Sequence, residues 1–137
     1  MSLAGRMKTL VVDDMDSSRA LVTNALRSLG IRNVTTVSNA KDAIDHVANN
    51  ETHLVLSDYN MPGMDGLSLL EHFRKQPSSR KIGFIVVTGR ATPGLVARGQ
   101  TLEMNNMIRK PFTAAQLREC IERVVGKLRK IRQLAGY

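Results

Sequence analysis

LVLSDYNMPGMDG, the stretch from Leu54 to Gly66, decides the fold because it carries an aspartate out of an apolar run and into a sharp turn. A short, continuous apolar run predicts a buried strand. Asp58 is therefore expected at the end of a strand, with Pro62, Gly63 and Gly66 turning the chain away. This placement points to a chemical role, because burying an unpaired charge costs free energy.

Similar apolar runs alternate with amphipathic segments along the rest of the chain. The predicted strands cover residues 9–12, 34–37, 54–57, 82–88 and 107–109, and a helix is predicted after each one. Buried strands that alternate with helices predict an α/β fold, in which right-handed crossovers give a doubly wound, five-stranded parallel sheet. Ligands bind such sheets beyond the carboxyl ends of the strands, where the strand order reverses.

The first and last helices carry the most specific local predictions. For the first, we expect a cap from Asp16, Ser17 or Ser18, an apolar stripe of Leu21, Ala25 and Leu29, and an end at Gly30. The last is expected to start at Thr113 and to carry apolar residues as far as Leu128.

The composition fits one globular domain, with 42% hydrophobic and 23% charged residues among 137. Residues 1–6 are interpreted as a leader or an expression remnant, 7–128 as the domain and 129–137 as a basic extension of the last helix. No apolar run is long enough to span a bilayer and no signal peptide is apparent, so a soluble, cytoplasmic protein is expected. The single cysteine, Cys120, excludes an internal disulfide and is predicted to be a small core residue.

The net charge of +8 is concentrated near the C-terminus, where eight of the 20 basic residues but two of the 12 acidic residues lie between Arg109 and Arg132. Such a segment could bind nucleic acid or an acidic partner, but a solvated helix face is the commoner explanation. Two Tyr, three Phe and no Trp offer no stacking surface, so direct nucleic-acid binding is not expected.

Polar side chains follow four of the five predicted strands. Asp13 and Asp14 follow the first, Asp58 the third, Thr88 ends the fourth, and Lys110 follows the fifth. Each alone has an ordinary explanation, such as a helix cap, an Asx turn or a solvated lysine, but their joint placement at one edge argues for a site. His46, His53 and His72 lie away from this edge and are expected at the surface.

The three carboxylates need cations. Two unit charges about 4 Å apart repel by about 4 kcal/mol at an effective dielectric of 20. Lys110 offsets one charge, and Mg²⁺, which prefers carboxylate, carbonyl and phosphate oxygens, would offset the rest. A carboxylate beside a metal, a hydroxyl and an ammonium can accept a phosphoryl group, and Asp58 is the best nucleophile because its strand lies between the acidic pair and Lys110.

These residues resemble the receiver domain of two-component response regulators, and most of all the single-domain chemotaxis regulators. The resemblance rests on VVDD (11–14), SDYNMPGMDG (57–66), VVTGRA (86–91) and KPFT (110–113), and covers residues 7–128. It implies a flavodoxin-like (βα)5 fold with strand order 2-1-3-4-5. It also implies a signalling switch that promotes only its own phosphorylation and dephosphorylation, driven by a sensor histidine kinase or phosphotransfer protein and read by a downstream effector, as a monomer or weak dimer.

The resemblance also assigns roles to individual residues. Asp58 would be the phosphoacceptor, with Thr88 and Lys110 contacting the phosphoryl group. Mg²⁺ would be held by Asp14, Asp58 and the backbone carbonyl of Asn60, with Asp13 acting through the water shell. The Lys110–Pro111 bond is expected to be cis.

Two positions and one helix depart from the family or vary within it. Met107 stands where the family often has an aromatic switch residue, so the signal is expected to pass through Thr88, the loop after it and this methionine. Arg90 lies at a variable position and is expected to alter the access of water to the acyl phosphate. The fourth helix holds Gly94 and Gly99 and is predicted to be short or mobile.

Two alternatives remain open. One is a receiver module detached from a longer regulator with a DNA-binding or enzymatic output domain. The other is a phosphatase or hydrolase on a related sheet, which the short connections disfavour because they leave little room for a substrate-binding cap.

Overall fold

The computed structural model describes residues 2–128 and contains five strands and six helices in that range. In chain order the elements are α1 (Leu3–Arg6), β1 (Lys8–Val12), α2 (Asp16–Ser28), β2 (Asn33–Val37), α3 (Ala40–Asn49), β3 (Leu54–Asp58), α4 (Gly66–Lys75), β4 (Gly83–Thr88), α5 (Pro93–Thr101), β5 (Asn106–Arg109) and α6 (Ala114–Val125). Within this range, no helix has the length and apolar character needed to cross a membrane.

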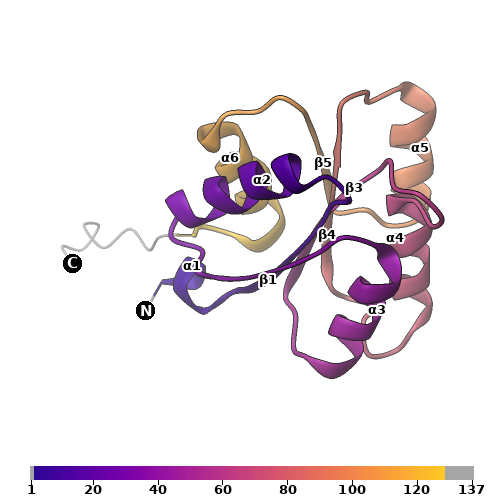
Figure 1. Ribbon diagram of the computed structural model, residues 1–137, viewed down its shortest axis with the longest axis horizontal. Helices are drawn as coiled ribbons and strands as arrows, with labels where there is room; N and C mark the ends of the chain where they lie inside the picture. Colours follow the sequence, from indigo (N-terminus) through magenta and orange to yellow (C-terminus); the bar gives the residue numbers. More distant parts are fainter. Residues whose placement is uncertain (1, 129–137) are drawn as a thin grey trace.

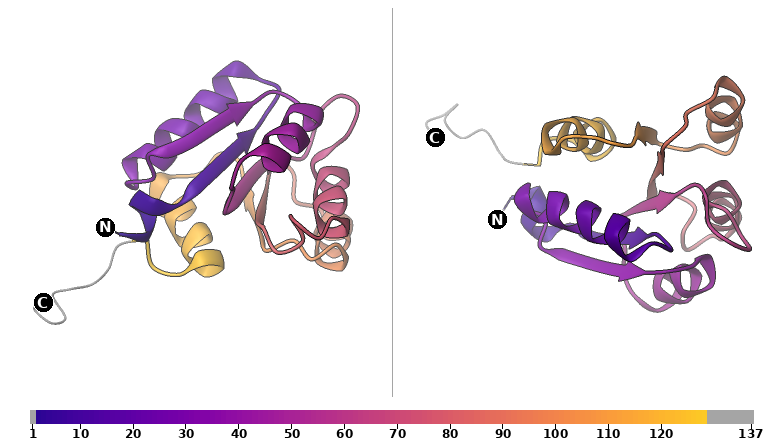
Figure 2. Two further views of the ribbon diagram at one scale, coloured as in Figure 1. Left: turned by 90° about the horizontal axis from the view of Figure 1, so that it is seen from below. Right: turned by 45° about the horizontal axis from the view of Figure 1, so that its top comes forward.

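The strands form a parallel sheet in the order β2-β1-β3-β4-β5, which confirms the predicted fold and strand order. Helices α2 and α6 cover one face, and α3, α4 and α5 lie on the other (Figure 1). Figure 2 shows these two layers of helices, one on each face of the sheet, from other directions. All five residues of the central strand β3 are buried, as expected for a strand covered on both faces.

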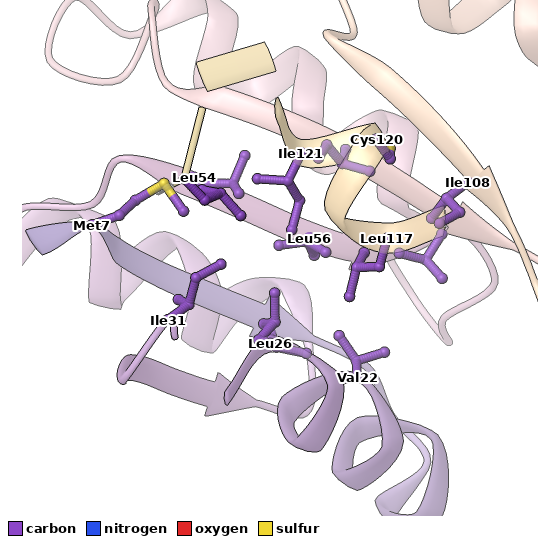
Figure 3. Packing of buried hydrophobic residues seen from close by; sticks show 14 of the residues in the cluster. Met7, Val22, Leu26, Ile31, Leu54, Leu56, Ile108, Leu117, Cys120 and Ile121 are labelled. Atoms are coloured by element: carbon purple, nitrogen blue, oxygen red, sulfur yellow. The ribbon is translucent and has the colours of Figure 1, made fainter. Parts of the chain in front are cut away.

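Two apolar cores fill the space between the sheet and its helices. On one face, Leu26 from α2 and Ile121 from α6 pack against Leu54 and Leu56 of β3 (Figure 3). On the other, Leu67, Leu70 and Phe73 of α4 pack against the sheet. Cys120 is 7% exposed and belongs to the first core, which confirms its predicted role.

One prediction about α2 is wrong, and a second is confirmed for two residues of three. The helix starts at Asp16, its N-cap is Met15, and none of the predicted side chains caps it. The Met15 backbone N–H donates to the Asp13 carboxylate. Ala25 and Leu29 of the predicted stripe pack against the core beside the buried Val22 and Leu26, whereas Leu21 is 70% exposed. The side of the helix that faces the sheet carries Val22, Ala25, Leu26 and Leu29 at helical spacing, and Leu21 lies outside it. The predicted end is confirmed, with Gly30 at φ +90 just beyond the helix.

The predicted continuation of the last helix to Leu128 is also wrong. Helix α6 ends at Val125 because Gly126 adopts φ +93, although Leu128 beyond it is still buried in the core. The predicted basic extension, 129–137, lies outside the described residues. At the other end, residues 3–6, interpreted as a leader, form α1 and bury Ala4, whose N–H donates to the Leu128 carbonyl.

Candidate functional site

The strand register brings the predicted site residues to one edge of the sheet. Val12 pairs with Ser57, so Asp13 and Asp58 follow side by side at the ends of β1 and β3. Asp58 pairs with Val87, which places Thr88 one residue further along β4. Thr88 pairs with Arg109, and Lys110 comes directly after it.

The three aspartates form a compact acidic cluster. Carboxylate oxygens of Asp13, Asp14 and Asp58 lie within 4.8 Å of one another. Asp13 and Asp58 are buried, whereas Asp14 is exposed. An oxygen-only donor set with one side open to solvent fits the preferences of Mg²⁺, which keeps part of its water shell.

Lys110 is the cation that reaches these buried carboxylates. Its Nζ lies 3.4 Å from Asp58 Oδ1 and 4.0 Å from Asp13 Oδ2. Burial raises the pKa of Asp58 above its ordinary value; Lys110 opposes that shift, and the charge of Asp13 adds to it. One lysine therefore leaves net negative charge in the cluster, so the residues present suit a divalent cation.

Thr88 and Arg90 are joined through the backbone after β4. The Thr88 hydroxyl is buried; it accepts a hydrogen bond from the Arg90 N–H at 3.1 Å and lies 3.3 Å from the Arg90 carbonyl, to which it donates. The Arg90 side chain is exposed at the rim of a groove of about 380 Å³ that Asn60, Thr88 and Arg98 also line.

The remaining predicted site residues lie in the loop after β3, on β5 and just after β5. Asn60 is exposed, two residues after Asp58. Met107 is half-buried against the core between the sheet and α4. The Lys110–Pro111 peptide bond is cis, as expected. His53 is exposed, and His46 and His72 are partly buried on α3 and α4, so none belongs to the acidic cluster.

Sequence reasoning missed two contributors to the site. The Ser18 hydroxyl accepts a hydrogen bond from Lys110 Nζ at 3.2 Å, a contact between residues 92 positions apart. Gly66 lies so close to β3 that a Cβ atom there would be 2.5 Å from the Asp58 carbonyl oxygen. The sequence predicts Ser18 as a helix cap and Gly66 as a turn residue, and no local pattern signals either contact.

The parallel sheet and the acidic cluster at its carboxyl edge define a class of protein, and comparison of the chain with known proteins identifies that class. The chain belongs to the response regulator receiver domain family, which it matches over residues 9–122. It is thus a receiver domain of two-component signalling and is similar to single-domain chemotaxis regulators. Members of this family are signalling switches and not classical enzymes. Membership implies interaction with histidine kinases and downstream targets.

Individual relatives narrow the comparison. The chain is 38% identical to a probable chemotaxis protein CheY from Rhizobium etli over 94% of its own length and 100% of the relative. It is 32% identical to chemotaxis protein CheY-3 of Vibrio cholerae, over 89% of this chain and 94% of the relative. A receiver domain of a Pseudomonas aeruginosa sensor histidine kinase, solved with magnesium in its active-site cleft, superposes with a TM-score of 0.79 at 29% identity, covering 88% of this chain and 98% of that one.

Proposed function

We propose that the protein accepts a phosphoryl group on Asp58 from the phosphohistidine of a sensor histidine kinase or phosphotransfer protein. One observation carries this proposal. The Asp58 carboxylate ends the central strand, within 4.8 Å of the carboxylates of Asp13 and Asp14 and 3.4 Å from Lys110 Nζ.

In the transfer, an Asp58 carboxylate oxygen forms a bond to phosphorus as the bond between phosphorus and the histidine nitrogen breaks. The imidazole takes the electron pair of the broken bond, and Asp58 becomes an acyl phosphate. Lys110 neutralises a phosphoryl oxygen, and the Thr88 hydroxyl donates to another after giving up its bond to the Arg90 carbonyl. The chain's chemistry is limited to its own phosphorylation and dephosphorylation.

Asp14, Asp58 and the Asn60 carbonyl would hold Mg²⁺, with Asp13 acting through the ion's water shell. The ion supplies positive charge to the acidic cluster and to the phosphoryl oxygens. The acidic cluster supports the choice of the aspartates, and the Asn60 carbonyl is chosen from the resemblance to the family. A similar receiver domain that was solved with magnesium in its active-site cleft supports the choice of ion.

Phosphorylation switches binding of a downstream protein. Because Thr88 bonds to the Arg90 backbone, a new contact from Thr88 to the phosphoryl group would release the loop that leads into α5. Met107 on the neighbouring strand β5 carries the change without an aromatic ring, and the exposed Arg90 side chain alters access of water to the acyl phosphate. We expect a cytoplasmic protein, a monomer or weak dimer, that does not bind nucleic acid directly.

The proposal is tested by incubating the protein with acetyl phosphate and Mg²⁺ and measuring its intact mass. The wild type should gain one phosphate and Asp58→Asn none. Equal labelling of both proteins would reject Asp58 as the acceptor. Turnover of small phosphoesters would instead favour a hydrolase.

A further inference from the structure

Lys110 is held by three acceptors, and the shortest contact is with a neutral one. Its Nζ lies 3.2 Å from Ser18 Oγ, against 3.4 Å from Asp58 and 4.0 Å from Asp13. The Ser18 contact is a hydrogen bond, whereas the two carboxylate contacts are ion pairs, and the 4.0 Å separation from Asp13 is too long for a hydrogen bond. The family assignment accounts for the two carboxylates but not for the hydroxyl.

The position of Ser18 is fixed by the loop before it. Ser18 is partly buried in the first turn of α2. The Met15 N–H donates to Asp13 Oδ1 at 2.9 Å, and Arg19 Nη1 donates to the Asp13 carbonyl at 2.7 Å. These bonds tie the start of α2 to the acidic cluster, so the hydroxyl is held where Lys110 reaches it.

A hydroxyl at this place has a specific electrostatic effect. It accepts from the ammonium without adding negative charge to a cluster that already holds three carboxylates. The Lys110 side chain is 30% exposed, so it has a route to solvent if its contacts weaken. Ser18, as a third acceptor, reduces the fraction of time that the Lys110 ammonium spends in solvent.

We propose that Ser18 is a positioning residue that holds the Lys110 ammonium inward, beside Asp58, where it neutralises the incoming phosphoryl group. This inference rests on the proposed function of Asp58. It predicts separate effects on phosphorylation and on cation binding. Lys110 and a divalent cation compete for the same carboxylates, so loss of the hydroxyl should slow phosphorylation while Mg²⁺ binds as tightly as before or more tightly.

The test compares Ser18→Ala with Ser18→Thr, which keeps a hydroxyl, and with Ser17→Ala, a matched control at the exposed neighbouring position. Initial rates of phosphorylation by acetyl phosphate are measured at saturating Mg²⁺, and Mg²⁺ affinity is measured by calorimetry without phosphodonor. We expect Ser18→Ala to be slower by about tenfold, the scale of a lost hydrogen bond to a charged group. Ser17→Ala should match the wild type, and Ser18→Thr should recover most of the rate.

A double mutant separates this role from a structural one. In a Lys110→Ala background, Ser18→Ala should cause no further loss of rate, because the two residues act through one contact. Full activity of Ser18→Ala, or equal losses of rate and Mg²⁺ affinity that Ser18→Thr does not recover, would overturn the assignment. Failure of the wild type to gain phosphate at Asp58 would instead reject the proposed function itself.

Discussion

Asp58 combines two properties that an acceptor carboxylate needs: it is held firmly, and it remains reachable. The residue ends a fully buried strand, and its own side chain is 10% exposed. Burial raises the pKa of Asp58, and the charge of Lys110 opposes that shift. One lysine does not neutralise three carboxylates, so the acidic cluster favours binding of a cation. The loop that leaves Asp58 must then turn away at once.

Gly66 makes that turn possible. A Cβ atom there would lie 2.5 Å from the Asp58 carbonyl oxygen, which is backbone and cannot move aside cheaply. We expect Gly66→Ala to lower the free energy of unfolding by about 1–3 kcal/mol, as overpacking does, and to slow phosphorylation because β3 shifts. The measurements are urea denaturation and the acetyl phosphate assay.

Gly94→Ala is the matched control for Gly66→Ala. A Cβ atom at this position in α5 meets nothing within 4 Å, and alanine favours a helix over glycine, so the variant should be as stable as the wild type or more stable. Equal stability of Gly66→Ala and the wild type would contradict the close approach.

Cys120 should be unreactive in the folded protein. Burial raises the pKa of its thiol from the ordinary 9.0 to about 11, so the thiolate is scarce at neutral pH. Alkylation by iodoacetamide at pH 8 should be slow in buffer and fast in urea. Because the folded pKa is the higher one, this thiol's contribution to stability is present below pH 9 and is lost as the pH rises towards 11. Rapid alkylation of the folded protein at pH 8 would contradict its burial.

At the scale of elements, α5 is the least firmly packed of the helices that cover the sheet. Gly99 is its one buried residue, whereas α4 buries five. We therefore expect amide hydrogens of residues 93–101 to exchange faster than those of α2, residues 16–28. Exchange in α5 as slow as in α2 would contradict the predicted mobility.

The connection after α5 is anchored by Arg74 of α4. Its guanidinium donates to the carbonyls of Ile82 and Arg80, to the Asn105 side chain and twice to the carbonyl of Glu103, a residue with φ +64. One side chain thus joins the end of α4 to the segments that precede β4 and β5. The loop after Thr88 precedes α5 and the anchored segment follows it, so a conformational change in α5 would occur between these two segments.

Loss of the anchor should be costly. Arg74→Ala leaves the part-buried Ile82 carbonyl without its donor and removes the exposed bonds to Arg80 and Glu103, so we expect the free energy of unfolding to fall by about 1–3 kcal/mol in urea denaturation. Lys75→Ala is the control, because its pair with Glu71 is exposed and such pairs contribute less than about 1 kcal/mol. Losses of equal size in the two variants would exclude the anchoring role.

At the scale of the molecule, the sequence predicted what depends on chain order and missed what depends on contact. The strand ends at Asp13, Asp58 and Thr88 could be read from apolar runs, and parallel topology then required them to share an edge. Ser18 could not be found this way, because its contact with Lys110 joins residues 92 positions apart. The exposure of Leu21 could not be found either, because it depends on how α2 packs against the sheet.

The chain's ends show the same limit. Ala4, in the segment that the sequence suggests is a leader, packs in a core that also contains Leu128 from beyond α6. The positive φ of Gly126 ends α6 early and returns the chain to that core. Local patterns report helix propensity, whereas burial of these residues depends on the assembled sheet.

The most direct test of the central claim locates the phosphoryl group on the chain. The protein is phosphorylated with acetyl phosphate and Mg²⁺ and treated at once with borohydride, which reduces an acyl phosphate to an alcohol. Peptide mass spectrometry should then find homoserine in place of Asp58, with Asp13 and Asp14 unchanged. Homoserine at position 13 or 14, or a phosphate that survives borohydride on a hydroxyl or histidine, would contradict the account.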